Sequence, residues 1–205
     1  MSDDRQAHWD HVYATKQDDE VSWYEPKPDH SLELVDAALS EGARSIVDIG
    51  GGTSRLVDGL IRRDLDRLAV LDVSESALAR SRDRLGPLAR KVEWISADVT
   101  DLDDLGVFDI WHDRAVFHFL ITEEDRRRYR DLAAKTLPAG GRLIIATFGP
   151  DGPNRCSGLD VRRYDRALLS SELGAGFIPA RDQIVDHQTP AGRHQQFLYA
   201  MFVRR

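Results

Sequence analysis

The strongest constraint on the fold is the stretch "SIVDIGGGTSRLVDGL", Ser45 to Leu60, where an apolar run precedes three glycines and a helical pattern. The apolar run predicts a buried strand over 45–50, and the later pattern predicts a helix over 53–63. Glycines between the two let the backbone approach a ligand closely. The stretch therefore predicts a strand, a ligand-binding turn and a helix, the first unit of an α/β sheet.

The same alternation continues along the chain. Helices are predicted over 74–85, with Ser74 as cap, and over 123–136, with Thr122 as cap. Further strands are predicted over 67–73, 92–99, 108–113 and 141–148. A helix over 164–173 and two strand-like runs around "TPAGR" close the pattern. We therefore expect an α/β, Rossmann-like seven-stranded sheet, mostly parallel with a C-terminal antiparallel hairpin, and helices on both faces.

The first 42 residues have a different character, with a short helix in 3–16, a proline loop over 21–28 and a helix that stops near Gly42. We expect 1–42 to be an N-terminal helical and aromatic lid segment and 43–205 to be the catalytic domain. Aromatic rings of a lid attract a cation and exclude water. The alternative is that they only anchor the segment. The aromatic residues concerned are Trp9, Tyr13, Trp23 and Tyr24.

Composition narrows the classes of function. The 205-residue chain has a formal net charge of −7, which disfavours nucleic acid as a partner. No apolar stretch approaches a membrane span, and the polar start lacks a signal core, so we predict a cytoplasmic protein without a membrane partner. Cys156 is the only cysteine, and no carboxylate cluster suits a metal, so we predict no disulfide and no metal site.

The glycine turn itself separates two classes of ligand. Nicotinamide and flavin enzymes use G-x-G-x-x-G, but here the frame from Gly50 reads G-G-G-T-S-R and puts Arg55 at the third required glycine. Asp48 at the strand end would repel a pyrophosphate. The turn instead suits a ligand that lacks phosphate and carries a positive charge.

S-Adenosylmethionine (SAM) is such a ligand, and at this point the sequence resembles the class I SAM-dependent methyltransferases. "DIGGG" (48–52) matches their first motif, "VLDVS" supplies the acidic residue after the second strand, and "SADVTDL" supplies the one after the third. Ser54 replaces a glycine that is frequent in the family. The resemblance implies that Asp72 holds the ribose hydroxyls and Asp98 the adenine amine. The alternative is that these aspartates only cap turns. The cofactor-binding residues expected are Trp23, Asp48, Gly50, Gly51, Gly52, Asp72, Val73, Asp98, Val99 and His112.

The stretch "WHDRAVFHFL" after the fourth strand holds the densest set of candidate catalytic residues, which are His112, Asp113 and His118. Histidine suits a proton acceptor near neutral pH. The spacing predicts that Arg114, Phe117 and His118 lie on one side of a helical turn. The alternatives are a positioning or capping role for Asp113 and a core role for His118.

The acceptor is less constrained than the cofactor. The N-terminal segment has the pattern W-D-x-x-Y followed by the loop 21–28, which carries Trp23. This pattern resembles that of the citrate synthase and elongation-factor lysine methyltransferases, and also that of thiopurine-type small-molecule methyltransferases. The resemblance implies methyl transfer to a nitrogen of a protein lysine or a small amine, with S-adenosylhomocysteine (SAH) as product. A small-molecule O- or S-methyltransferase is the alternative, and the oligomeric state stays open.

Two other classes fit the sequence less well. A nicotinamide-dependent oxidoreductase would need the third glycine and a Tyr-x-x-x-Lys set, and a non-catalytic relative would be expected to lose the three aspartates. A loop over 147–165 is expected to close the substrate side. Its candidate residues are Arg155, Cys156, Arg163 and Tyr164.

Overall fold

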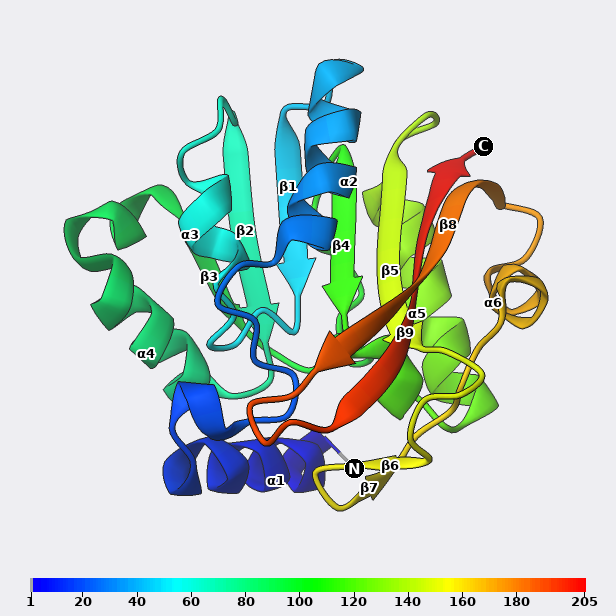
Figure 1. Cartoon of the computed structure of the whole chain (residues 1–205). Coiled ribbons are helices and arrows are strands. Elements are labelled where there is room, and N and C mark those ends of the chain that lie inside the picture. Colours follow the sequence, from blue (N-terminus) through cyan, green and yellow to red (C-terminus); the bar gives the residue numbers. More distant parts are fainter. Residues whose placement is uncertain (1) are drawn as a thin grey trace.

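The computed structural model describes residues 2–205, with side chains described from residue 4 onward. Its centre is a seven-stranded sheet with the order β3-β2-β1-β4-β5-β9-β8 (Figure 1). β1 to β5 pair in parallel, and β9 pairs antiparallel with both β5 and β8. The strands are β1 (Ser45–Ile49), β2 (Arg67–Asp72), β3 (Glu93–Ser96), β4 (Ile110–Arg114), β5 (Arg142–Phe148), β8 (Phe177–Gln188) and β9 (His194–Arg204).

Helices cover both faces of this sheet because side chains of successive strand residues point to opposite sides. Ile46 packs in a core cluster with α2, α3 and α4, whereas Val47 packs in a second cluster with α5 and α6. The α-helices are α2 (Asp29–Ser40), α3 (Leu56–Leu60), α4 (Glu75–Leu85), α5 (Glu123–Thr136) and α6 (Arg166–Leu173). Short 3-10 helices are η1 (Asp18–Glu20), η2 (Gly86–Lys91) and η3 (Phe117–Phe119).

Two further segments lie at the end of the sheet where the parallel strands terminate. Helix α1 (Ser2–Thr15) crosses below the carboxyl ends of the strands (Figure 1). Beside it lies a small hairpin of β6 (Arg155–Cys156) and β7 (Leu159–Asp160). The carboxyl ends of the strands are therefore covered by segments from distant parts of the chain.

The predicted architecture is confirmed, including the seven strands and the antiparallel closing pair. The caps are confirmed too, since Ser74 Oγ accepts from the Ala77 amide and Thr122 Oγ1 accepts from the Asp125 amide. The helix predicted over 53–63 is only α3, because the turn after β1 runs on to Arg55. The hairpin of β6 and β7 was not predicted.

The prediction for the segment after β4 was wrong in one respect. Arg114 is the last residue of β4 and does not share a helical turn with Phe117 and His118. Ala115, with φ of +72°, redirects the chain directly after the strand. A left-handed residue at this position separates strand geometry from the short helix η3.

Candidate active site

The glycine turn after β1 packs so tightly that side chains are excluded from it. The amides of Gly50 and Gly51 both donate to the carbonyl of Leu71 on β2. Gly50 has φ of +68°, and a Cβ on it would lie 2.0 Å from Val116 Cγ2. Gly52 has φ of +40°, and a Cβ on it would lie 2.9 Å from Asp72 Oδ2. The turn thus needs glycine for both conformation and space.

Gly51 needs glycine for space alone. Its φ is not in the left-handed region, but an added Cβ would lie 2.5 Å from Val70 Cγ1 and 2.8 Å from Asp48 Oδ2. The middle glycine therefore has a packing reason that the sequence pattern did not reveal.

Asp48 and His112 form a buried hydrogen-bonded chain with Ser31. Asp48 Oδ1 lies 2.7 Å from His112 Nδ1, and His112 Nε2 lies 2.9 Å from Ser31 Oγ. A neutral ring satisfies both contacts when Nδ1–H donates to Asp48 and Nε2 accepts from the serine hydroxyl. The other oxygen, Asp48 Oδ2, is buried and has no hydrogen-bond partner among the described residues. An unpaired carboxylate oxygen of this kind is suited to a cationic ligand group.

Asp72 ends β2 and lines a large cavity at this edge of the sheet. Its Oδ1 accepts from the Ser74 amide at 2.8 Å. Burial raises the pKa of Asp72 to about 7. Its side chain is therefore held in place but short of partners, as expected for a group that a ligand completes.

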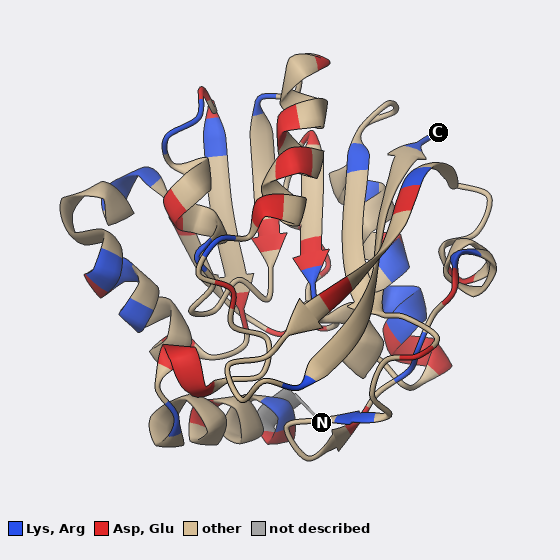
Figure 2. Ribbon diagram, in the orientation of Figure 1, with Lys and Arg blue, Asp and Glu red and all other residues tan. Residues whose placement is uncertain are grey.

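Asp98 follows β3 and lines the same cavity. Its Oδ1 accepts from the amide and the hydroxyl of Thr100, at 2.8 Å and 2.7 Å. Its Oδ2 accepts from Arg5 Nη1 at 3.0 Å, which ties α1 to the floor of the cavity. Figure 2 shows acidic residues at the ends of β1 and β4 as well, so negative charge gathers where the parallel strands terminate.

The large cavity has about 830 Å³ of empty space. Its floor, where the acidic residues lie, is formed by Ile49, Gly50, Leu71, Asp72, Val73, Ala97, Asp98 and Val99. Its other part, which we name the aromatic chamber, is bounded by the rings of Trp9, Trp23, Phe119, Phe148 and Phe197. One cavity thus joins an acidic floor to an aromatic chamber.

A smaller cavity with about 490 Å³ of empty space lies on the other side of the glycine turn. Asp48, Gly51 and His112 line it. Trp23, Gly50 and Arg114 line both cavities, so the two spaces adjoin. The structure therefore brings together nine of the predicted cofactor-binding residues around these spaces, and Gly52 supports the turn beneath them.

Asp113 and His118 are not among the residues that line either cavity. Asp113 is fully buried and accepts from the Val116 and Phe117 amides and from the Tyr129 hydroxyl. Burial raises the pKa of Asp113 to about 6. These contacts fit the capping role that was the alternative for this residue.

His118 is fully buried and stacks on Phe148, with ring centroids 4.3 Å apart. Its Nδ1 accepts from the Phe148 amide. Burial, reinforced by Arg114, lowers the pKa of His118 to about 3. The ring is therefore neutral near pH 7, and its surroundings fit the core role better than the catalytic one.

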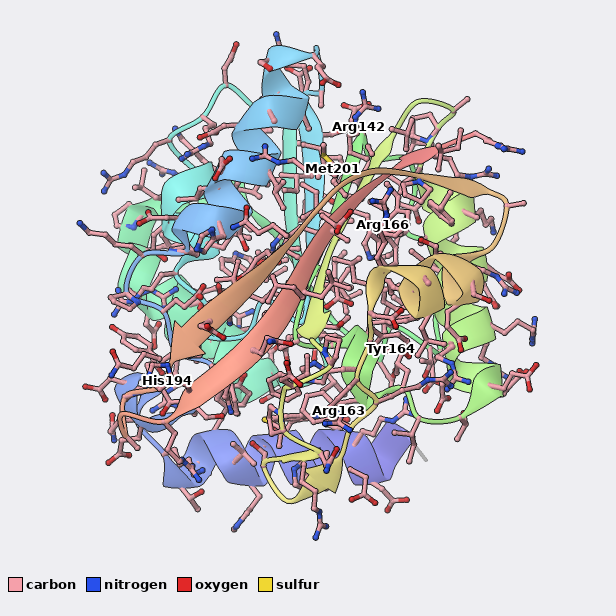
Figure 3. All side chains as sticks on the ribbon, turned by 45° about the vertical axis from the view of Figure 1, so that its right-hand side comes forward. Arg142, Arg163, Tyr164, Arg166, His194 and Met201 are labelled. Atoms are coloured by element: carbon pink, nitrogen blue, oxygen red, sulfur yellow. The ribbon has the colours of Figure 1, made fainter. Side chains whose placement is uncertain are left out.

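The loop after β5 contributes one residue to the site. Cys156 lines the large cavity, with its Sγ 3.8 Å from Ser22 Oγ, and burial raises the pKa of the thiol. Arg155 is exposed, and Figure 3 shows Arg163 and Tyr164 on the segment that runs from β7 to α6. Tyr164 is buried against Phe117, with ring centroids 5.4 Å apart.

Two arginines at the site were not predicted as site residues. Arg5 reaches Asp98 from α1, and its Nη2 also donates to Asp125 at 2.5 Å. Arg114 donates from Nε to the Tyr199 hydroxyl and from Nη1 to the Trp23 carbonyl. Only the position of Arg114 at the end of the fourth strand could have indicated it, because its partners lie far away in the sequence.

The structure contains no cluster of three or more His, Cys, Asp or Glu side chains suited to a metal ion among the residues described. Within residues 2–205, no helix combines the length and apolarity needed to cross a bilayer.

Comparisons with known proteins agree with this geometry. Residues 46–141 match a methyltransferase domain family. An uncharacterized methyltransferase of Mycobacterium tuberculosis, Rv3342, is 32% identical over 123 residues, which are 57% of this chain and 45% of that protein. The chain thus spans less than half the length of this relative.

Solved structures share the fold. The N-methyltransferase NodS from Bradyrhizobium japonicum WM9, in complex with SAH, has a TM-score of 0.73 and 18% identity, covering 97% of this chain and 98% of that one. The 1,6-didemethyltoxoflavin-N1-methyltransferase of Burkholderia thailandensis has a TM-score of 0.72 and 23% identity, covering 99% and 86%. At these identities the likeness is one of fold.

Proposed function

We propose that the chain is a class I SAM-dependent methyltransferase, which binds SAM in the two adjoining cavities and transfers its methyl group to a nucleophile. The match of residues 46–141 to a methyltransferase domain family supports this proposal. The observation that carries this proposal is the set of three aspartates, Asp48, Asp72 and Asp98, arranged around one glycine turn. A donor set of carboxylates and close-packed glycines fits hydroxyl, amine and ammonium groups and disfavours phosphate.

Each aspartate has a proposed partner on the cofactor. Asp72 accepts hydrogen bonds from the ribose hydroxyls, and Asp98 accepts from the adenine amine between Val73 and Val99. The unpaired oxygen of Asp48 in the small cavity receives the ammonium group. His112 holds Asp48 in this orientation through its 2.7 Å contact. Trp23 borders both cavities and shields the reacting groups from water.

Bound SAM supplies an electrophilic methyl group on a sulfonium. The protein's task is then to align the acceptor and exclude water, which accounts for the buried walls of the aromatic chamber. The segment 1–42 acts as a lid through α1 and the loop that carries Trp23, while 43–205 provides the transferase sheet. The proposed partners are the cofactor and its acceptor, without nucleic acid.

A nitrogen acceptor, on a protein lysine or a small amine, and a small-molecule oxygen or sulfur acceptor both remain within this proposal. The large cavity favours a small molecule, because Trp9 of α1 and Cys156 of β6 line it and these two segments would have to move aside for a folded protein. A small compound needs only a transient opening of these covers.

The test of the cofactor is calorimetric titration of the protein with SAH, with NADH as the paired control. We expect micromolar binding of SAH and none of NADH. Asp72→Asn should weaken SAH binding by about 10- to 100-fold, because hydrogen bonds to a charged group contribute about 1.5–3 kcal/mol. Binding of NADH alone, or equal affinity in the variant, would contradict the proposal.

A further inference from the structure

The aromatic chamber is a preformed box rather than a flexible opening. The Trp9 ring meets Trp23 edge to face at 5.7 Å and Phe119 at 5.1 Å between centroids. On the opposite wall, Phe148 and Phe197 lie 4.8 Å apart. These rings come from α1, the loop after η1, η3, β5 and β9, so five segments fix the shape. Flat apolar molecules are the ligands that such walls accommodate.

Arg114 supplies the charge in this chamber. Its guanidinium carbon lies 4.8 Å from the centre of the Phe197 ring, and the side chain is only 11% exposed. Nε and Nη1 are bound to Tyr199 and to the Trp23 carbonyl. Nη2 is buried and lies 2.9 Å from Glu25 Oε1, with which it forms an ion pair. Arg114 is therefore held by three partners, and only the second N–H of Nη1 is left for a ligand, because the Trp23 carbonyl takes the other.

The negative charges are distributed differently. The carboxylates that line the large cavity are Asp72 and Asp98, both on the floor. Glu25, the ion-pair partner of Arg114, lines the small cavity and not the large one. Within the large cavity, a group in the aromatic chamber therefore meets the guanidinium of Arg114, whereas the Glu25 carboxylate that partly offsets its charge lines the small cavity. This arrangement disfavours an ammonium group and favours an anion.

We propose that the acceptor is a planar, apolar small molecule whose nucleophile is an anionic oxygen or sulfur, held in the aromatic chamber beside Arg114. This inference rests on the proposed function and specifies its substrate class. The remaining N–H of Arg114 Nη1 donates to the anion, and the rings of Trp9 and Phe148 enclose the apolar body. An alkylamine or a lysine would be a poor acceptor in the same space.

The step balances without a base from the protein. The acceptor loses its proton to water before it enters the chamber. A lone pair of the anionic heteroatom forms a bond to the methyl carbon while the bond from that carbon to the sulfonium sulfur breaks, and the bonding pair stays on sulfur. The products are a neutral methyl ether or thioether and SAH. The desolvation cost of burying the anion and the sulfonium is partly offset because their opposite charges attract each other. The transfer then removes both charges.

The first experiment is a panel of acceptors of similar shape with labelled SAM and the unmodified protein. We expect transfer to 4-nitrophenol, which ionises near neutral pH, or to 4-nitrothiophenol, which is already ionised there, and at least tenfold slower transfer to benzylamine and to a lysine peptide. The rate should rise with pH up to the ionisation of each phenol or thiol. The two anionic arms distinguish oxygen from sulfur. Faster transfer to benzylamine or to the peptide would overturn the inference.

The second experiment tests Arg114 itself. Arg114→Met should lower kcat/KM for the anionic acceptors by about 10- to 100-fold, as expected for loss of a charge-assisted hydrogen bond, and Arg114→Lys should restore part of it. SAH affinity, measured by calorimetry, should stay within about twofold of the parent. A fall in SAH affinity equal to the fall in kcat/KM would mean that Arg114 holds the cofactor instead, and would overturn this inference.

A matched control separates these effects from lost packing. Arg67 also stacks on a ring, with its guanidinium carbon 3.9 Å from the centre of Phe108, and pairs with Glu93, but it begins β2 at the opposite end of the sheet. Arg67→Met should keep the parent kcat/KM. Failure of SAH to bind the parent protein would instead contradict the proposed function, so the two ideas fail separately.

Discussion

The floor of the large cavity and its cover are held together in different ways. Floor residues lie at or just beyond the carboxyl ends of β1, β2 and β3, and backbone contacts such as that of the Gly50 amide with the Leu71 carbonyl fix them. Cover residues come from α1 and from segments near β6 and β9, and side chains such as Arg5 and Arg114 hold them. The order of the strands alone therefore places the floor, where we propose that the cofactor binds. The aromatic chamber, where we propose that the acceptor binds, depends on contacts between distant segments.

This comparison separates the expected effects of mutation. Changes in the floor should reduce cofactor affinity, and changes in the cover should alter exchange or acceptor choice. Changes in the core beneath both should reduce stability alone.

The largest effect is expected in the floor, for Gly50→Ala. The left-handed backbone costs about 1–2 kcal/mol, and the collision with Val116 adds about 1–3 kcal/mol. Val116 lines the cavity, so its displacement should also abolish measurable SAH binding. Calorimetry and denaturant unfolding would measure both.

Gly86→Ala is the control for Gly50→Ala. Gly86 has φ of +57° but open space around its Cβ position, so alanine there should lower the free energy of unfolding only through backbone strain. Equal losses of SAH affinity in the two variants would show that the tight turn is not what binds the cofactor.

The next effect is expected in the core, for His118→Ala. Removing a fully buried ring that stacks on Phe148 should lower the free energy of unfolding by about 2–3 kcal/mol. SAH affinity should not change. Exposed His194, at the start of β9, provides His194→Ala as a neutral control (Figure 3). A folded His118→Ala protein of parent stability that has lost turnover would instead support the catalytic role.

A smaller effect concerns pH and Asp72. Its pKa of about 7 in the folded protein lies above the ordinary value of 3.8, so between these values the folded state retains a proton that the unfolded state has lost. The ligand-free protein should therefore lose stability as the pH rises from 4 to 7, by at most about 1.4 kcal/mol per pH unit from this group. Asp72→Asn should flatten the dependence in thermal unfolding. Parallel curves would mean that Asp72 is already ionised across this range.

The smallest effect is expected in the cover, for Arg5→Ala. Arg5 is 27% exposed in its ion pair with Asp98, so the loss should be up to about 1 kcal/mol. If α1 opens before SAH leaves, dissociation should quicken by up to about fivefold in stopped-flow measurements. Arg127→Ala, which breaks an exposed pair with Glu124 on α5, is the control. Unchanged dissociation would argue that α1 does not gate the cofactor.

Most of the fold could be predicted because each parallel strand corresponds to a short apolar run between turn residues in the sequence. Asp48, Asp72 and Asp98 were assigned as cofactor-binding residues from the resemblance to the class I SAM-dependent methyltransferases. They lie together because the carboxyl ends of parallel strands meet at one edge of a sheet. The roles themselves remain predictions, but their common location follows from strand order.

The remainder could not be predicted from local patterns. Arg114 looked like part of a helical turn because sequence spacing cannot reveal that Ala115 adopts a left-handed conformation. His118 looked like a proton acceptor because the sequence does not show that Phe148 stacks on it. Pairs such as Arg5 with Asp98, 93 positions apart, depend on the completed tertiary structure.

The place of β9 in the sheet has a consequence for how the protein is made. β5 pairs with β9, and residues 149–193 lie between these two strands. At ribosomal rates of about 5–20 residues per second, a nascent chain carries the apolar edge of β5 unpaired for some seconds before its partner emerges. That edge, "LIIATF", is rich in β-branched residues, so a chaperone that shields it during synthesis should raise the yield of native protein.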